Sequence, residues 1–195
     1  MIDKYSKIVI LGAGIGGLTT AIALRQKGFN NISIYERRLK ATTIGAGLVL
    51  WSNATKILNK LKLLTELEKV GGQLEQMQRW TKNEEFLGAI NVSKINNSIG
   101  FKSYSISRTD LQSILLKKVY ELNISINYNH NALNISYQDN TNSINFENDI
   151  SVNAQIVIGA DGRMNSITRQ YVNGNNTPVY QGKRTLFLLK NSINY

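Results

Sequence analysis

The N-terminal pattern of hydrophobic and polar positions predicts a strand, a helix and a second strand. Ile8–Leu11 is an apolar run short enough for a buried strand. Apolar residues over Ile15–Lys27 fall at helical spacing, and Gly28 stands where a helix C-terminal glycine belongs. A second strand is expected at Ile32–Tyr35. This order is typical of an α/β fold with a parallel sheet.

Residues 73–105 have a different hydrophobic pattern, with short apolar segments separated by polar turns. The predicted strands are Leu74–Trp80, Phe86–Val92 and Phe101–Ile106. The turns between them include Lys82–Glu85 and Asn96–Ser98. A meander inserted into an α/β unit indicates part of a second layer or domain.

Two amphipathic helices flank this meander. The first, with Ala54 as its first apolar position, would be capped by Ser52 or Asn53, and the second would follow Arg108 with Thr109 as its cap. An arginine at a helix start is usually a surface residue, but Arg108 would also be well placed for a phosphate.

The C-terminal part of the pattern predicts a third parallel strand and a β-meander. The strand is expected at Ile124–Tyr128, and alternating segments over Leu133–Val152 predict the meander. An apolar strand at Ala154–Ile158 then leads to Gly159-Ala160-Asp161-Gly162-Arg163 and a short helix from Ser166. We therefore expect an α/β, Rossmann-like three-layer fold, with a parallel sheet and a β-meander crossover.

The first turn carries the strongest chemical signal. Gly12, Gly14 and Gly17 form G-x-G-x-x-G between the first strand and the helix, and Glu36 follows the second strand at the spacing of a ribose-binding carboxylate. The helix N-terminus at Ile15 would offer N–H groups and a favourable dipole to a pyrophosphate. An ordinary tight turn is the alternative, and an Asp-Gly turn without function is the alternative at Asp161.

Composition narrows the function classes. The 195-residue chain is 42% hydrophobic, which is typical of a globular protein, and it contains no cysteine for a disulfide or a thiolate metal site. The net charge of +10 is spread along the chain without aromatic residues among basic runs, so we expect no nucleic-acid partner. No apolar stretch is long enough for a transmembrane segment, and a cytoplasmic location is expected.

No catalytic or metal-binding constellation emerges from the residue types. His130 is the only histidine, and it lies beside asparagines in an expected surface turn. The chemistry is therefore expected to belong to a cofactor, with no catalytic side chain and no metal ligand assigned.

Four segments, taken in order, resemble the FAD-dependent aromatic-hydroxylase type of flavoprotein monooxygenase, which includes para-hydroxybenzoate, salicylate and urate hydroxylases and tetracycline-inactivating monooxygenases. They are GAGIGG with Glu36-Arg37, GAGLVLWSNATKILNKLKL, SRTDLQSIL and VIGADGRMNSITR. The resemblance covers roughly residues 7–172, the N-terminal half of such an enzyme. In such enzymes NAD(P)H reduces FAD, oxygen adds to give a flavin hydroperoxide, and one oxygen atom passes to a small, electron-rich substrate.

The resemblance implies cofactor-binding roles at particular positions. The glycine turn would hold the FAD pyrophosphate, Glu36 the adenosine ribose, Arg37 the adenine side, and Arg108 the phosphate or ribityl region. The implied FAD-binding residues are Gly12, Gly14, Ile15, Gly17, Glu36, Arg37, Gly45, Gly47, Arg108, Leu133, Asp161 and Gly162. Asp161 and Gly162 belong to a motif associated with both FAD and NAD(P)H.

The chain also departs from the family pattern. Ser52 stands where the family usually has proline, and Lys62 where it tends to have glycine, so a left-handed helix end is less comfortable at Lys62. The sequence no longer follows the family after Gly182, and no Gly-Asp-Ala-Ala-His-like segment is present.

These departures shape the expected domains and the alternative function. We expect a discontinuous FAD-binding domain at 1–72 and 105–177, with incomplete substrate-domain strands at 73–104 and 178–195. The alternative is a truncated or split-gene FAD-binding fragment without catalysis of its own, and its candidate partner is a separately encoded C-terminal half.

Overall fold

The computed structural model describes residues 3–41, 46–174 and 179, and these form two compact units. Unit 1 comprises residues 3–41, 115–174 and 179, and unit 2 comprises residues 46–114. These units have different boundaries from the expected FAD-binding domain at 1–72 and 105–177 and the expected substrate-domain strands. That functional division stays a prediction.

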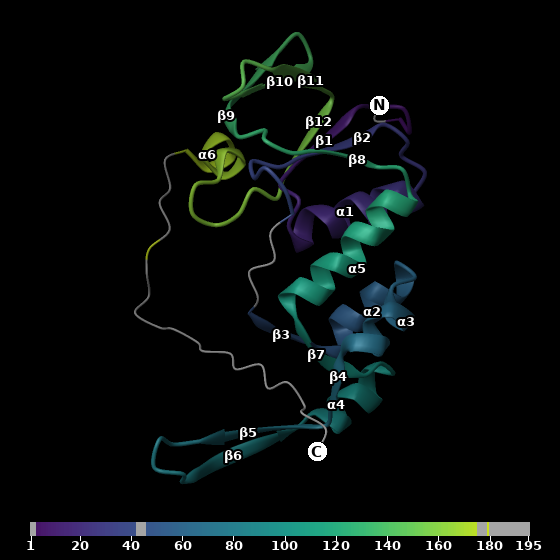
Figure 1. The fold of residues 1–195 in the computed structure, drawn as a ribbon, viewed down its shortest axis with the longest axis vertical. Helices are drawn as coiled ribbons and strands as arrows, with labels where there is room; N and C mark the ends of the chain where they lie inside the picture. Colours follow the sequence, from purple (N-terminus) through teal and green to yellow (C-terminus); the bar gives the residue numbers. More distant parts are fainter. Residues whose placement is uncertain (1–2, 42–45, 175–178, 180–195) are drawn as a thin grey trace. The chain divides into compact units, whose positions relative to one another are not determined.

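Unit 1 is built on a four-stranded parallel sheet with the strand order β12-β1-β2-β8 (Figure 1). A three-stranded antiparallel meander, in the order β11-β10-β9, accompanies this sheet. The elements of the unit are β1 (Ile8–Leu11), α1 (Ile15–Gln26), β2 (Ile32–Tyr35), β8 (Ser125–Asn127), β9 (Ala132–Gln138), β10 (Thr141–Phe146), β11 (Ser151–Ala154), β12 (Ile156–Gly159) and α6 (Ile167–Asn173).

Strand alternation explains why unit 1 has three layers. The register pairs Ile8 with Ile32 and Ile10 with Ile34, so these buried isoleucines share one face of the sheet. Val9 and Leu11 point to the other face, where they form a core cluster with meander residues that include Ile144 and Phe146. Figure 1 shows α1 on one side of the sheet and the meander on the other. The expected α/β, FAD-binding type of fold is confirmed at the level of these layers.

Unit 2 contains two small antiparallel sheets and four helices or parts of helices among its described residues. One sheet has the order β3-β7-β4, and the other consists of the β5–β6 hairpin. The elements are β3 (Gly47–Leu50), α2 (Ser52–Lys60), α3 (Leu64–Val70), β4 (Gly72–Leu74), β5 (Gln76–Trp80), β6 (Phe86–Asn91), α4 (Val92–Ile99) and β7 (Ser103–Ser107). Helix α5 (Arg108–Glu121) begins in unit 2 and ends in unit 1.

Three local expectations in unit 2 are wrong. The polar stretch that includes Asn96 lies in helix α4, which Asn91 caps by accepting a hydrogen bond from the Lys94 N–H. Ser107, and not Thr109, caps α5, because its hydroxyl accepts from the Asp110 N–H at 2.9 Å and donates to the Asp110 carboxylate at 2.6 Å.

The expected cap of α2 is wrong as well, because Trp51 is the N-cap and Ser52 is the first helical residue. Proline is favoured at this first position, and Trp51 has the extended conformation that a residue before proline requires, with φ −67° and ψ 159°. Ser52 is fully buried, and its hydroxyl oxygen has no hydrogen-bond partner. The departure from the family proline therefore leaves a buried polar atom unsatisfied.

One strand boundary in unit 1 also differs from its prediction. Ala154 ends β11 of the meander, and the parallel strand β12 begins at Ile156. Gln155 separates the two strands, and its side chain accepts a hydrogen bond from the Lys7 N–H at 2.7 Å. The predicted strand Ala154–Ile158 therefore exists as β12, but its predicted ends lie one or two residues too close to the N-terminus.

Candidate functional site

The candidate site in unit 1 lies at the carboxyl ends of β1, β2 and β12, which are adjacent in the sheet. Parallel strands of α/β proteins bind ligands at this edge. The glycine turn after β1, Glu36 after β2 and the loop that starts at Ala160 after β12 all meet there. The structure thus brings together segments that are far apart in the sequence.

The packing of the protein explains two of the three motif glycines. Gly12 has a φ of +109°, and a Cβ there would lie 2.3 Å from the Ala160 carbonyl oxygen. A Cβ on Gly17 would lie 1.9 Å from the Gly12 carbonyl oxygen. Both positions therefore require glycine for the turn and for close packing of α1 against it.

Gly14 is different, because among the described residues no atom outside its chain neighbours and its own helix lies within 4 Å of the position that its Cβ would take. Its backbone is extended, with φ −79° and ψ −178°, and any residue adopts this conformation. Gly14 is the N-cap of α1 and provides no side-chain cap for the N–H groups in the first turn of the helix. Such a cradle suits a phosphate group that approaches the backbone closely.

Glu36 is held firmly in place beside the glycine turn. Its Oε2 accepts a hydrogen bond from the Ala13 N–H at 2.8 Å, and its Oε1 accepts one from the Arg38 N–H at 3.0 Å. Each carboxylate oxygen retains a further lone pair. The side chain is half-buried, and these two bonds orient it for hydroxyl donors. The neighbouring Arg37 is exposed.

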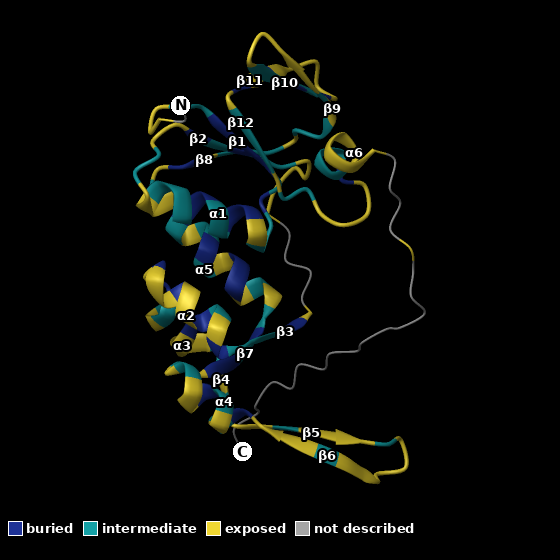
Figure 2. Cartoon of the chain, turned by 180° about the vertical axis from the view of Figure 1, so that it is seen from behind, coloured by how far each residue is buried: buried dark blue, intermediate teal, exposed yellow. Residues whose placement is uncertain are grey.

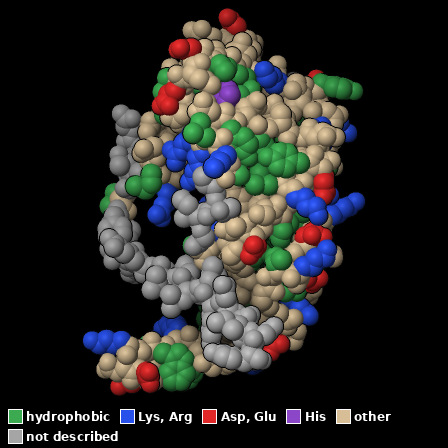
Figure 3. Space-filling model, viewed as in Figure 1, with side chains coloured by type: hydrophobic (Ala, Val, Ile, Leu, Met, Phe, Trp, Pro, Cys, Tyr) green, Lys and Arg blue, Asp and Glu red, His purple; other side chains and the backbone are tan. Residues whose placement is uncertain are grey.

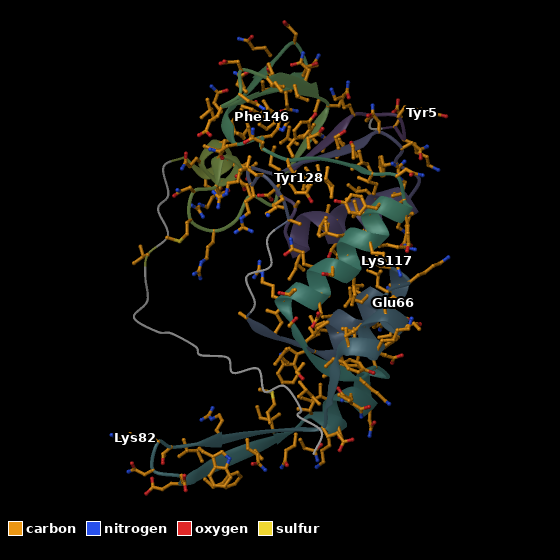
Figure 4. The ribbon with its side chains drawn as sticks, viewed as in Figure 1. Tyr5, Glu66, Lys82, Lys117, Tyr128 and Phe146 are labelled. Atoms are coloured by element: carbon orange, nitrogen blue, oxygen red, sulfur yellow. The ribbon has the colours of Figure 1, made fainter. Side chains whose placement is uncertain are left out.

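An aromatic cluster supports the segment around Glu36. The Tyr35 ring stacks on Phe146, which is labelled in Figure 4, with centroids 4.9 Å apart. The centroid of the His130 ring lies 5.2 Å from each of these two rings. The His130 Nδ1 lies 2.7 Å from the Tyr128 carbonyl oxygen, and its backbone N–H donates to the Glu36 carbonyl. The expected surface placement of His130 is therefore wrong, because its half-buried ring packs between the sheet and the meander.

Asp161 has structural partners that the sequence did not reveal. Its Oδ1 accepts hydrogen bonds from the hydroxyls of Ser166 at 2.7 Å and Thr168 at 2.6 Å, and its Oδ2 accepts one from the Thr168 N–H at 3.2 Å. These bonds hold the loop between β12 and α6 in one conformation.

The rest of that loop is fixed from within and presents backbone at the surface. The Arg169 guanidinium donates to the carbonyls of Arg163 and Met164. Gly162 is exposed at a φ of +95°, and apart from its chain neighbours no atom of the described residues lies within 4 Å of the position that a Cβ would take. The loop therefore offers open backbone at Gly162, while Asp161 is turned toward the protein.

The remaining candidate residues lie elsewhere. Leu133 is 51% exposed on β9. Gly47 and Arg108 lie together in unit 2, where Gly47 pairs with Ser107 and the Arg108 N–H donates to the Ala46 carbonyl at 2.9 Å. The side chain of Arg108 is exposed. Gly45 lies outside the described residues.

The described residues give no sign of other chemistry. They contain no group of three or more histidine, aspartate or glutamate side chains placed to hold a metal ion. No described helix is both long and apolar enough to cross a membrane. A dinucleotide cradle is thus the chemical feature that the geometry defines, and the class of protein is a dinucleotide-binding α/β domain.

Comparison with known proteins assigns the family. The family described as "FAD binding domain" matches residues 5–185, so the chain belongs to that family. The chain is 36% identical to an FAD-dependent urate hydroxylase of Mycolicibacterium vanbaalenii over 172 residues, which are 86% of the chain and 42% of the relative. It is 28% identical to a 6-hydroxynicotinate 3-monooxygenase of Bordetella bronchiseptica, with 90% of the chain and 45% of that protein covered.

Solved structures agree on the fold. HpxO of Klebsiella pneumoniae, crystallised with FAD and uric acid, is 24% identical with a TM-score of 0.74, covering 85% of this chain and 41% of that one. Tetracycline destructase Tet(55) is 22% identical with a TM-score of 0.69, covering 90% and 43%. The resemblance to flavoprotein monooxygenases is therefore confirmed, and the chain spans less than half the length of these relatives.

Proposed function

We propose that this chain is the FAD-binding portion of an NAD(P)H-dependent monooxygenase that hydroxylates a small aromatic or electron-rich substrate. The observation that carries the proposal is the open space in front of Gly14, at the N-terminus of α1 and beside the oriented Glu36 carboxylate. Contacts within the protein explain Gly12 and Gly17, whereas Gly14 fits a ligand that approaches the backbone.

Each residue would have a limited task. The N–H groups from Gly14 to Gly17, including that of Ile15, would hold the pyrophosphate, and Glu36 would accept hydrogen bonds from the ribose hydroxyls. Arg37 and the backbone at Leu133 would lie toward the adenine. Gly45, Gly47 and Arg108 would contact the flavin and phosphate regions, and Gly162 would present backbone to the cofactor, positioned by Asp161.

When bound, FAD would supply the redox chemistry that the protein side chains lack. In the overall reaction NAD(P)H provides two electrons, one oxygen atom of O2 enters the substrate, and the other leaves as water. The protein's contribution would be orientation and the exclusion of water. A cytoplasmic location stays a prediction.

Replacing Glu36 tests the proposal directly. Glu36→Gln removes the charge while keeping the size of the side chain, and we expect FAD affinity to fall at least tenfold, about 1.4 kcal/mol. Glu121→Gln is the matched control, because Glu121 lies on α5 and pairs with Lys118 at 3.1 Å. Titration of each purified protein with FAD measures the effect. Equal affinity in both variants would remove the role of Glu36.

A second candidate function is FAD binding without catalysis by this chain alone. The specific observation in its favour is that the urate hydroxylase relative is more than twice as long, with only 42% of it covered. A separately encoded C-terminal half is the proposed partner. NAD(P)H oxidation by the purified chain separates the candidates, since substrate-stimulated turnover by these 195 residues would exclude the second one.

A further inference from the structure

The end of helix α6 in unit 1 carries an asparagine that glycine follows. Asn173 is the last residue of the helix, and Gly174 is its C-cap. The two residues form the only Asn-Gly pair in the sequence, and both are exposed. None of the α6 residues is buried, and Figure 2 shows the helix mainly in the colours of exposed and intermediate residues. This end of α6 is therefore open to solvent.

The backbone amide of Gly174 has no hydrogen-bond acceptor among the described residues. By contrast Gly100, which ends α4, donates its N–H to the Asn96 carbonyl at 2.8 Å. The side-chain amide of Asn173 bonds to none of the described residues either. Apart from its chain neighbours, no described atom lies within 4 Å of the place that a Cβ on Gly174 would take. The Gly174 nitrogen is thus unbonded and unshielded.

Such a nitrogen is an intramolecular nucleophile toward the asparagine before it. It can attack Cγ of Asn173, so that an N–Cγ bond forms and the Cγ–Nδ2 bond breaks, while the amide proton leaves with Nδ2 as ammonia. Water then opens the resulting cyclic imide at either ring carbonyl, which gives aspartate or isoaspartate without any change of oxidation state. Adjacency replaces a bimolecular encounter, and glycine has no side chain to obstruct the attack.

Ring closure requires a rotation about ψ of Asn173, and the helix permits it. Because Asn173 is the last helical residue, its carbonyl has no partner within the helix, and the rotation leaves the preceding turn intact. We propose that Asn173 is a modification site, at which the exposed end of α6 deamidates spontaneously through the Gly174 nitrogen.

Other asparagines that precede a small residue lie where the fold holds the next amide. Asn97-Ser98 lies inside α4, so the Ser98 N–H belongs to the helix ladder. Asn142-Ser143 lies in β10, the central strand of the meander, which pairs with both β9 and β11. These pairs are internal controls for the open amide of Gly174.

The modification adds a negative charge at the C-terminus of α6. The helix dipole disfavours an anion there, and α6 has no basic residue in its last turn to offset it. We therefore expect the last turn to loosen. The other end stays anchored, because the Ser166 and Thr168 hydroxyls donate to the Asp161 carboxylate at 2.7 and 2.6 Å.

Ageing of the purified full chain tests the proposal. The protein is held at neutral pH with and without guanidinium chloride, and peptide mapping by mass spectrometry follows each asparagine. We expect Asn173 to react in the native chain within about fivefold of its rate in the denatured chain, whereas the native fold slows Asn97 and Asn142 at least tenfold. Protection of Asn173 by more than about fivefold would overturn the proposal.

A substitution of the glycine tests the chemistry. Gly174→Ala shields the nitrogen, and we expect Asn173 to react at least tenfold more slowly than in the parent. The denatured chain gives this comparison free of any strain from the φ of +69°. Gly16→Ala, at a glycine of α1, is the control and should leave the rate unchanged. Equal rates with Gly174→Ala, or conversion to aspartate without isoaspartate, would overturn the cyclic-imide route.

The converted chain can be isolated for a structural readout. Figure 3 shows Lys and Arg side chains on several parts of the visible surface, and conversion lowers the formal net charge of +10 by one, so cation-exchange chromatography separates the two forms. Hydrogen exchange in the last turn of α6 should be at least tenfold faster after conversion, and equal exchange would overturn the loosening. The proposal is independent of FAD binding, since the reaction uses only Asn173, Gly174 and water.

Discussion

Strands β1 and β6 are both apolar in sequence, yet they have opposite environments. In β1, Ile8, Val9 and Ile10 are completely buried, because α1 covers one face of the sheet and the meander covers the other. In β6, Leu87 and Ile90 remain 58% and 46% exposed. The difference teaches that an apolar sequence does not by itself bury a strand, because burial depends on the elements that pack against its faces.

The largest expected effect is at the glycine turn of unit 1. Gly17→Ala would place a Cβ 1.9 Å from the Gly12 carbonyl oxygen, so α1 must move away from the turn. We expect a loss of about 3 kcal/mol or more in the free energy of unfolding, measured in urea. In Gly16→Ala, a control within the same helix, no atom of the described residues outside that helix and the chain neighbours lies within 4 Å of the new Cβ, so this variant should be no less stable than the parent.

A smaller and opposite effect is expected in unit 2. Lys62 has a φ of +59°, so it adopts the left-handed conformation that is less comfortable for lysine than for the glycine of the family. Lys62→Gly should stabilise the chain by about 0.5–1 kcal/mol, because glycine adopts this conformation without a Cβ penalty. Hydrogen exchange should show slower opening of α2. Faster opening would mean that the lysine side chain contributes more than its backbone costs.

The smallest effect is expected in the β5–β6 hairpin of unit 2. Leu87→Ala should change the free energy of unfolding of the isolated chain by less than about 0.5 kcal/mol, since the side chain is 58% exposed. Ile10→Ala, at a fully buried residue of β1, should cost about 3 kcal/mol. Urea unfolding of both variants measures the contrast. A large loss from Leu87→Ala would contradict the exposure of this side chain in the β5–β6 hairpin.

Periodicity and the glycine motif were sufficient to predict the core of unit 1. The apolar run of β1 needed no knowledge of its neighbours, since a strand buried on both faces is continuously apolar. Helix α4 was missed because its asparagines resemble a turn. Its ends did carry signals, since Asn91 caps it and Gly100 ends it in a left-handed conformation with φ 78°.

The site was predictable in composition but not in its internal bonds. Gly14 and Glu36 follow from spacing alone, whereas their binding roles remain predictions. The contact of Gly12 with Ala160 depends on the pairing of β12 with β1, and the local sequence does not show which strands pair in the tertiary structure. The bonds of Asp161 to Ser166 and Thr168 likewise require the loop to fold back, and the packing of His130 on Phe146 requires the meander.

The most direct test of the central claim is an FAD titration of the purified chain and of Gly14→Val, followed by flavin fluorescence. The extended backbone of Gly14 accepts valine, and among the described residues no atom outside its chain neighbours and its own helix lies within 4 Å of its Cβ, so the far-ultraviolet circular dichroism should be unchanged. We predict that the parent chain binds FAD and that Gly14→Val weakens binding at least a hundredfold, about 2.7 kcal/mol. Equal binding by the two proteins, or no binding by the parent, would contradict the account.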